Sequence, residues 1–188
     1  MGTFYPREHY NSGYMILRQA EHYLDHEKRM AIAKQFVSGA VANIRRVLRY
    51  YQNRGKNLHG TLEAIDNLEQ SLESCSNVSE LMALEGNIRN YYYKAFDHIL
   101  ENPDFVFEER SRRPPKNYLN SLISFGNSIL YACILSEIYR THLDPRIGFL
   151  HATNFRRFSL NLDVAEIFKP IIIDRLIFTM IGKKMITK

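Results

Sequence analysis

The sequence predicts an all-α protein, a bundle of several helices that follows a short extended N-terminal arm. Three observations lead to this prediction. Glycine and proline are scarce, at 9 and 6 in 188 residues, and a chain with few turns favours long helices. Apolar residues recur at every third or fourth position along most of the chain. No segment beyond the arm shows the period of two that is typical of a half-buried strand.

The composition fits one globular domain. Hydrophobic residues make up 45% and charged residues 24% of the chain, which excludes disordered and collagen-like proteins. The two cysteines form neither a zinc motif nor a disulfide framework, as is usual in a reducing cytoplasm. The first residues have no apolar signal core, and no uncharged stretch approaches the ~20 apolar residues of a membrane span. We expect a soluble cytoplasmic protein that does not contact a membrane.

The first half of the chain divides into an arm and two helices. Residues 1–13 mix aromatic residues with a proline and end in a turn, so they are expected to be extended. Helical periodicity begins at residue 14 and continues to residue 24. Asp25 is a typical N-cap for a long helix over residues 26–52. The apolar stripe of this long helix consists of Met30, Ala33, Val37, Val41, Ile44, Leu48 and Tyr51.

The middle of the chain predicts two more helices and a stiff loop. A polar helix covers residues 61–73. Asn77 and Glu80 have the spacing of a capping box and begin a helix that continues to Ile99. Pro103 lies just beyond its end. Residues 105–116 are crowded with charge and contain two prolines, so they form a loop.

The last part of the chain predicts a central helix and a final helix. Residues 118–141 are apolar on nearly all sides, so this helix should lie at the centre of the bundle. It includes Cys133, which we expect to be a buried thiol. A turn at residues 143–146 and a basic loop at residues 154–158 follow. The final helix begins near Ser159 and continues through Pro170 to Ile181. Residues 14–188 thus form one helical domain.

Three polar positions in helical or apolar segments are candidates for chemistry. Glu85 precedes a glycine on a helix, although pairing with Arg89 at i+4 would equally explain it. His151 lies among apolar residues, where a histidine is often structural and is also a common metal ligand. Asp163 and Glu166 share one helix face, where acidic residues also interact with the helix dipole.

Together, these residues suggest a metal site. Two or three carboxylates and one imidazole make an oxygen-rich set that suits Mg²⁺ or Mn²⁺ rather than structural zinc. Such an ion can polarise a phosphodiester and activate a nucleophile. The net charge of +5 fits a polyanionic partner. The basic residues around the candidate site are Arg112, Arg113, Lys116, Arg146, Arg156, Arg157, Lys169 and Arg175.

Five segments in fixed order resemble the motifs of a known family. They are residues 84–89 (LEGNIR), 112–115 (RRPP), 124–131 (SFGNSILY), 143–151 (LDPRIGFLH) and 159–166 (SLNLDVAE). This series is similar to the helical domain of CRISPR-associated protein 1, the integrase and endonuclease of the spacer-acquisition module. The resemblance extends from about residue 2 to residue 175.

The resemblance implies an enzyme that inserts short duplex DNA into a CRISPR repeat array by transesterification. It implies that Glu85, His151 and Glu166 hold the divalent metal, and that Asp163 lies close to it. Tyr131 and Lys169 match positions near the reacting phosphate, although Tyr131 in an apolar helix is equally explained as a core tyrosine. The residues expected to contact DNA are Arg89, Arg112, Arg113, Arg146, Arg156 and Arg157.

The resemblance also implies partners and raises alternatives. Members of the family bind double-stranded DNA and CRISPR-associated protein 2, and they dimerise through an N-terminal β-rich domain. This chain begins at what resembles the interdomain arm and ends soon after the last motif, so the β domain and the C-terminal tail are expected to be missing. A non-catalytic basic scaffold that binds DNA, or an inactive fragment of the family, is therefore an alternative to an active nuclease.

Overall fold

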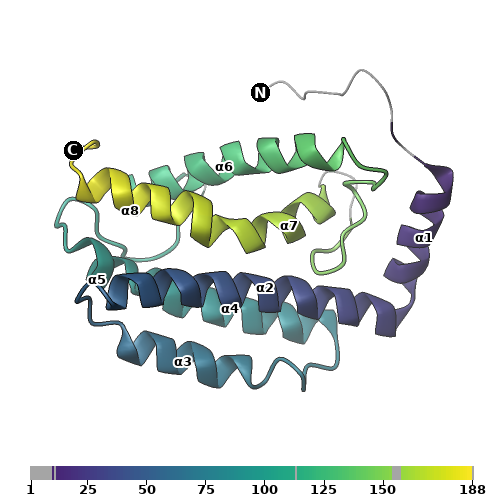
Figure 1. Ribbon diagram of the computed structural model, residues 1–188, viewed down its shortest axis with the longest axis horizontal. Helices are drawn as coiled ribbons and strands as arrows, with labels where there is room; N and C mark the ends of the chain where they lie inside the picture. The colour runs from purple at the N-terminus through teal and green to yellow at the C-terminus, as the bar shows by residue number, and fades with distance from the viewer. Residues whose placement is uncertain (1–9, 11, 113, 154–157, 188) are drawn as a thin grey trace.

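The computed structural model describes residues 10, 12–112, 114–153 and 158–187, and the regular structure within them is helical (Figure 1). This confirms the predicted all-α class. Residues 1–9 and 11 of the predicted arm lie outside the described residues. The helices are α1 (Gly13–Leu24), α2 (His26–Gln52), α3 (His59–Glu69), α4 (Val78–Lys94), α5 (Phe96–Leu100), α6 (Tyr118–Ile138), α7 (Ser159–Lys169), the π-helical segment η1 (Pro170–Asp174) and α8 (Arg175–Gly182).

The long helix α2 runs through the middle of the bundle (Figure 1). It packs against α3 and α4 on one side and against α7 and η1 on the other. The helix α6 packs on α7 and η1, farther from α2, and α1 crosses the beginning of α2. As a result, α7 lies between α2 and α6, where residues of several elements can meet.

The helix starts follow the predicted capping chemistry. The Asp25 carboxylate accepts a hydrogen bond from the Lys28 amide at 3.0 Å, which satisfies a donor that a helix N-terminus otherwise leaves unpaired. Asn77 accepts from the Glu80 amide at 3.0 Å, and the Glu80 carboxylate accepts from the Ser76 amide at 2.8 Å. Both predicted N-caps are confirmed. The helix predicted to continue to Ile99 is interrupted at Ala95, where α4 ends and α5 begins.

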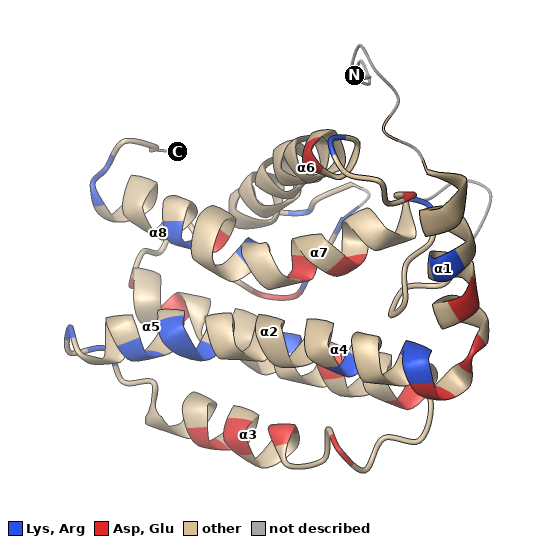
Figure 2. Cartoon of the chain, turned by 45° about the vertical axis from the view of Figure 1, so that its right-hand side comes forward, with Lys and Arg blue, Asp and Glu red and all other residues tan. Residues whose placement is uncertain are grey.

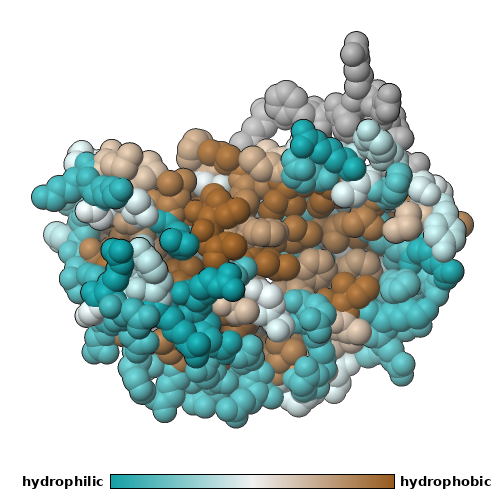
Figure 3. All heavy atoms as spheres, in the orientation of Figure 1, coloured by the Kyte–Doolittle hydropathy of each residue, from teal (hydrophilic) through white to brown (hydrophobic). Residues whose placement is uncertain are grey.

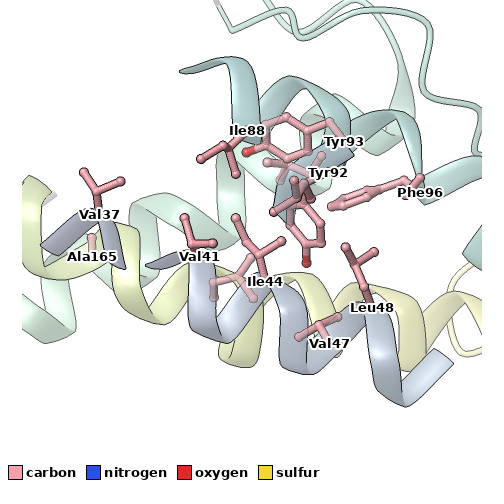
Figure 4. Packing of buried hydrophobic residues seen from close by; sticks show 14 of the residues in the cluster. Val37, Val41, Ile44, Val47, Leu48, Ile88, Tyr92, Tyr93, Phe96 and Ala165 are labelled. Atoms are coloured by element: carbon pink, nitrogen blue, oxygen red, sulfur yellow. The ribbon is translucent and has the colours of Figure 1, made fainter. Parts of the chain in front are cut away.

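The core forms where the apolar stripes of α2 and α4 meet (Figure 4). The predicted stripe of α2 is buried from Met30 to Leu48, and Tyr51 is half-buried. Removing such a side chain from water contributes roughly 1.5–3 kcal/mol. Figure 4 labels side chains from both helices, one from α5 and one from α7: Val37, Val41, Ile44, Val47, Leu48, Ile88, Tyr92, Tyr93, Phe96 and Ala165.

The prediction that residues 118–141 lie at the centre of the bundle is wrong. The helix α6 buries one face, while Phe125 is 66% and Ile129 is 45% exposed, and apolar surface is visible between α6 and α7 (Figure 3). The thiol predicted to be buried, Cys133, is exposed. Because the helix is apolar on nearly all sides, its sequence does not indicate which side is buried.

The helix α6 also contradicts the expectation that no segment is apolar enough to span a membrane. By length and composition alone, α6 is the one helix among the described residues that could cross a membrane. The sequence had been expected to contain no such segment. In this structure the helix packs against α7 and η1.

The final predicted helix is continuous in space but changes its type at Pro170. Proline has no amide hydrogen, so it cannot make the usual bond to the preceding turn. The chain adopts a π-helical turn over Pro170–Asp174 and then continues as α8. This wider turn contributes Ile173 and Asp174 to the interior, where both are buried.

Asp174 makes the stability of this fold dependent on pH. Its Oδ2 atom has no hydrogen-bond partner among the described residues. Burial raises the pKa of the Asp174 carboxyl group to about 7, although Arg89 from α4 and Lys169 from α7 act in the opposite direction. Tyr92 of α4 and Glu166 of α7 also face this group.

We predict that Asp174→Asn stabilises the protein more at pH 8 than at pH 5. In the unfolded chain the carboxyl group loses its proton near pH 4, whereas in the folded chain it keeps the proton up to about pH 7. Between these values its contribution to stability falls by at most about 1.4 kcal/mol per pH unit as the pH rises. Urea unfolding across this range measures the difference. The exposed Asp104→Asn variant is the control, and an equal effect of Asp174→Asn at both pH values would contradict the prediction.

Candidate active site

The loop that carries His151 is tied to the beginning of α7. The Gly148 amide donates to the Ser159 hydroxyl at 2.8 Å, and the Leu160 amide donates to the Pro145 carbonyl at 3.1 Å. The Ser159 hydroxyl in turn donates to the Arg146 carbonyl at 2.5 Å. These bonds satisfy polar groups at the start of α7, which lacks a side-chain N-cap of the usual kind. The loop and the helix therefore form one unit.

Asp163 fixes the position of His151. This aspartate is 0% exposed, and its carboxylate accepts hydrogen bonds from the amides of Phe149, Leu150 and His151 at 2.6, 3.0 and 2.9 Å. Its Oδ1 atom also lies 2.8 Å from Nδ1 of the His151 ring. A carboxylate oxygen accepts this hydrogen bond, so in the neutral form of the imidazole Nδ1 carries the proton and Nε2 has the lone pair.

This geometry gives Asp163 a definite contact with His151. Both of its oxygens accept hydrogen bonds from the loop, so it positions His151, and its predicted place in the metal site stays a prediction. Metal-binding histidines commonly donate their second ring N–H to a carboxylate in this way. The half-buried His151 ring, at 21% side-chain exposure, is thus oriented with one free nitrogen.

A buried arginine joins the two glutamates of the predicted site. Arg89 Nε donates to Glu85 Oε1 at 2.8 Å within α4, and Arg89 Nη2 lies 2.5 Å from Glu166 Oε2 on α7. Lys169, one turn beyond Glu166, pairs with its other oxygen. The guanidinium group of Arg89 therefore links Glu85 to Glu166, and Glu166 links Arg89 to Lys169.

These cations keep Glu166 ionised. Burial alone would raise the pKa of its carboxyl group, but Arg89 and Lys169 lower it to about 2. Burial would likewise lower the pKa of the Lys169 ammonium group, and Glu166 raises it above its ordinary value. His151 also contributes to lowering the pKa of Glu166, which indicates that the imidazole and the carboxylate are electrostatic neighbours.

Arg89 is placed differently from what was expected. It was predicted to contact DNA, but it is 7% exposed and is held by two carboxylates. Its position suits a residue that holds Glu85 and Glu166 together, and it does not suit a contact with DNA at the surface. The i,i+4 pair of Glu85 and Arg89, considered from the sequence as the simpler explanation, is present.

Tyr131 lies beside this network. The Lys169 ammonium is 5.1 Å from the centre of the Tyr131 ring, a distance at which a cation is attracted to an aromatic face. The ring is half-buried and packs against the core. The role of Tyr131 and Lys169 near a reacting phosphate stays a prediction.

The residue types fit a divalent metal, although the carboxylates are engaged by cations. Among the described residues there is no group of three His, Cys, Asp or Glu side chains that could hold an ion in the present arrangement. In this arrangement Arg89 contacts oxygens of Glu85 and Glu166, and Lys169 contacts the other oxygen of Glu166. Glu166 Oε2 nonetheless has no hydrogen bond of good geometry, and His151 presents a free nitrogen.

The other predicted DNA contacts are only partly described. Arg112 is exposed. Arg146 is exposed and pairs with Asp144 at 2.5 Å. Arg113, Arg156 and Arg157 lie outside the described residues.

Gly148 and Ser159 are two residues of the site that the sequence did not single out. A Cβ atom at Gly148 would lie 2.6 Å from the Ser159 carbonyl carbon, 2.7 Å from the Leu160 nitrogen and 2.8 Å from Asp163 Oδ2. Only glycine allows the loop to approach α7 this closely. The motif at residues 143–151 contains this glycine, but its spacing alone does not show what the backbone approaches.

We predict that Gly148→Ala displaces His151 and lowers stability. The added methyl group meets backbone atoms that cannot rotate away, so the loop must shift, which we expect to cost about 1–3 kcal/mol. Thermal unfolding measures the loss, and the NMR signals of the His151 ring report the displacement. Gly60→Ala is the control, because a Cβ there has nothing within 4 Å. An unchanged His151 spectrum in Gly148→Ala would refute the role given to this glycine.

Known proteins are similar to this chain over its whole length. The profile of the CRISPR associated protein Cas1 family matches residues 1–188. The "CRISPR-associated endonuclease Cas1 2" of Thermodesulfovibrio yellowstonii is 63% identical over 186 residues, which is 99% of this chain and 56% of that protein. The chain thus spans little more than half the length of this curated relative.

Solved structures share the fold. A CAS1 protein from Thermotoga maritima superimposes with a TM-score of 0.90 at 51% identity, covering 100% of this chain and 58% of the other. A chain of a partial Cas6-RT-Cas1–Cas2 complex superimposes with a TM-score of 0.87 at 25% identity, covering 95% of this chain and 53% of that chain. The resemblance drawn from the five motifs is confirmed. Because the family profile matches from the first residue to the last, the chain belongs to the Cas1 family.

Proposed function

We propose that this chain is the catalytic part of a divalent-metal-dependent DNA endonuclease and integrase of CRISPR adaptation. The observation that carries the proposal is the orientation of His151 by the buried Asp163, next to the ionised Glu166. The names of the relatives support nuclease activity in the family. Their origin in bacteria and archaea supports a place in the prokaryotic cytoplasm.

The proposed reaction is the attack of a DNA 3′-hydroxyl, or of water, on a phosphodiester. The new P–O bond replaces the ester bond to one sugar oxygen, and that oxygen leaves as a hydroxyl with the proton given up by the nucleophile. Glu85, His151 and Glu166 would hold Mg²⁺ or Mn²⁺, which supplies a Lewis acid for the phosphoryl oxygens when it is bound. The chain's own residues prepare the site. Asp163 keeps the lone pair of the neutral His151 ring on Nε2. Arg89 holds the two carboxylates close together, and Arg89 and Lys169 keep Glu166 ionised. Lys169 carries a positive charge that offsets the charge that develops on the phosphate.

The partners proposed for this function are double-stranded DNA and Cas2. Spacer precursors and the CRISPR repeat are the DNA substrates that the resemblance implies. A structural neighbour comes from a complex that contains Cas2, which supports Cas2 as a partner of the intact protein. Dimerisation is proposed for the intact protein as well.

One observation favours a second candidate, a helical domain that binds DNA without cutting it. The carboxylates of Glu85 and Glu166 form ion pairs with two cations, Arg89 and Lys169, so their charges are already neutralised. If these ion pairs persist in the presence of Mn²⁺, the cations hold both carboxylates and His151 is left as the main ligand, which is too few to bind the ion tightly. DNA binding would then survive the loss of His151, and cleavage would be absent from the start.

We predict that Glu166→Gln abolishes Mn²⁺-dependent cleavage of branched DNA. The substitution keeps the shape of the side chain and removes the charge that would bind the metal, so the rate should fall by a factor of 100 or more. Cleavage of a labelled branched duplex, with and without Mn²⁺, measures the effect. Glu63→Gln, at an exposed position on α3, is the matched control.

Glu166→Gln also leaves Arg89 and Lys169 without their shared partner, so folding must be checked by circular dichroism. His151→Ala provides an independent variant, because this side chain is half-buried and its ring contacts one carboxylate. Full cleavage activity in a folded His151→Ala variant would rule out the proposed site. An inactive parent that binds DNA would favour the second candidate.

A further inference from the structure

A group of exposed arginines lies outside the candidate active site. We define the α2–α8 basic surface by Arg46, Arg49 and Tyr50 of α2, Arg54 in the turn after α2, and Arg175 at the start of α8. All five are exposed, Tyr50 at 39%. Residues 46, 49 and 50 are three and four positions apart, so they lie on one face of α2. The face is slightly hollowed, and the hollow is lined by Ala42, Arg45, Arg46, Arg49, Tyr50 and Asn53.

Aromatic contacts hold this surface in place. The guanidinium carbons of Arg54 and Arg175 lie 4.7 and 5.1 Å from the centre of the Tyr50 ring. Tyr50 contacts Tyr51 edge to face at 5.0 Å, and Tyr51 contacts the buried Phe178 of α8 at 5.4 Å. Contacts with the core thereby fix the Tyr50 ring, and the guanidinium groups of Arg54 and Arg175 both lie against it.

The arginines of this surface have no acidic partners among the described residues. No ion pair is formed by Arg46, Arg49, Arg54 or Arg175 within the described part of the chain. Arg45, on the flank of the same helix, contrasts with them because it pairs with Asp66 and Glu69 of α3. Figure 2 shows Lys and Arg gathered where α2 ends and α8 begins, whereas many acidic residues lie on α1, α3 and α7.

Four unpaired guanidinium groups on one surface repel one another. Two unit charges 4 Å apart interact by roughly 1 kcal/mol in water, and this cost is removed when an anion lies between them. Arginine also presents a planar set of donors that matches a phosphate. A surface of this kind fits a ligand that carries several regularly spaced phosphates.

The surface is distinct from the candidate active site but rigidly connected to it. The site uses α4, α6, α7 and the His151 loop, and none of the five residues belongs to it. The Asn43 side chain on α2 donates to the Ile167 carbonyl on α7 at 2.9 Å, next to Glu166. One helix therefore carries the basic surface at its end and supports the site helix near its middle.

We propose that the α2–α8 basic surface binds the phosphate backbone of duplex DNA at a distance from the reacting phosphate. The proposal rests on the proposed function, because it concerns the same substrate. It assigns the surface a share of the affinity and no part in the chemical step. The backbone would lie across Arg46 and Arg49 and reach Arg54 and Arg175 beside Tyr50.

The test is DNA affinity in a variant with three arginines replaced, Arg46→Gln, Arg49→Gln and Arg175→Gln. A labelled duplex is titrated without divalent metal, so that no cleavage occurs, at several salt concentrations. Each lost phosphate contact lowers the slope of log K against log salt by roughly 0.9. We expect the slope to fall by about that amount per engaged arginine and the affinity to fall at least about tenfold at low salt.

The matched control replaces two arginines that are exposed but paired, Arg18→Gln and Arg140→Gln. Arg18 pairs with Glu21 and Arg140 with Glu137, each at 2.9 Å. An unchanged affinity and salt slope in the triple variant would overturn the proposal, and would be the result if the surface binds an acidic protein instead. An equal loss in the control pair would also overturn it, since net charge alone would then explain the effect.

Cleavage separates this proposal from the proposed function. At saturating DNA, the triple variant should cut at the parent rate, because its substitutions do not touch the site. Glu166→Gln, which removes a negative charge, should bind DNA at least as tightly as the parent and fail to cut. Unimpaired cleavage by Glu166→Gln defeats the proposed function only, and unimpaired binding by the triple variant defeats the basic surface only. A folded parent with no salt-dependent binding of duplex DNA would refute the basic surface directly.

Discussion

The contact on which the rest of the structure depends is the buried guanidinium of Arg89 between Glu85 and Glu166. Removing a charge from water costs several kcal/mol, which is offset only when partners of good geometry are present. Arg89 has a carboxylate from its own helix and one from α7. Its ion pairs therefore join α4 to α7 inside the bundle. The residues that make this connection are also residues of the candidate site.

Asp163 is a second buried charge with good hydrogen-bond partners, and these partners come from the loop that carries His151. Its carboxylate is fully buried and is stabilised by three backbone amides and one imidazole. The loop gains partners for amides that would otherwise be unsatisfied, and His151 gains a fixed tautomer. Both parts of the site thus rely on charges that the interior tolerates because their hydrogen-bond partners come from different segments.

Local features of this structure could be predicted from the sequence, and features that depend on distant segments could not. The caps Asp25 and Asn77 and the stripe of α2 depend on neighbours a few residues away, and they are confirmed. The pair of Glu85 and Arg89 was visible at i,i+4. The bond from Arg89 to Glu166 joins residues that are 77 positions apart in the sequence. The hydrogen bonds from the loop amides to Asp163 depend on how closely Gly148 approaches α7, which the sequence does not show. The place of α6 was missed because a helix that is apolar on every side has no periodicity to orient it.

The balance of charge in the site bears on how metal and DNA would act together. Glu85 and Glu166 are matched by Arg89 and Lys169, so the site is nearly neutral without an ion. A divalent cation bound to these residues would leave an excess of positive charge in a poorly solvated place, which is unfavourable unless an anion is present. A DNA phosphate supplies that anion. Within the proposed function, metal and DNA should therefore bind more tightly together than either does alone, and by linkage each raises the affinity for the other by the same factor. Arg89 and Lys169 stabilise the two buried carboxylates when no metal ion is bound. They would also disfavour metal binding until the DNA phosphate is in place.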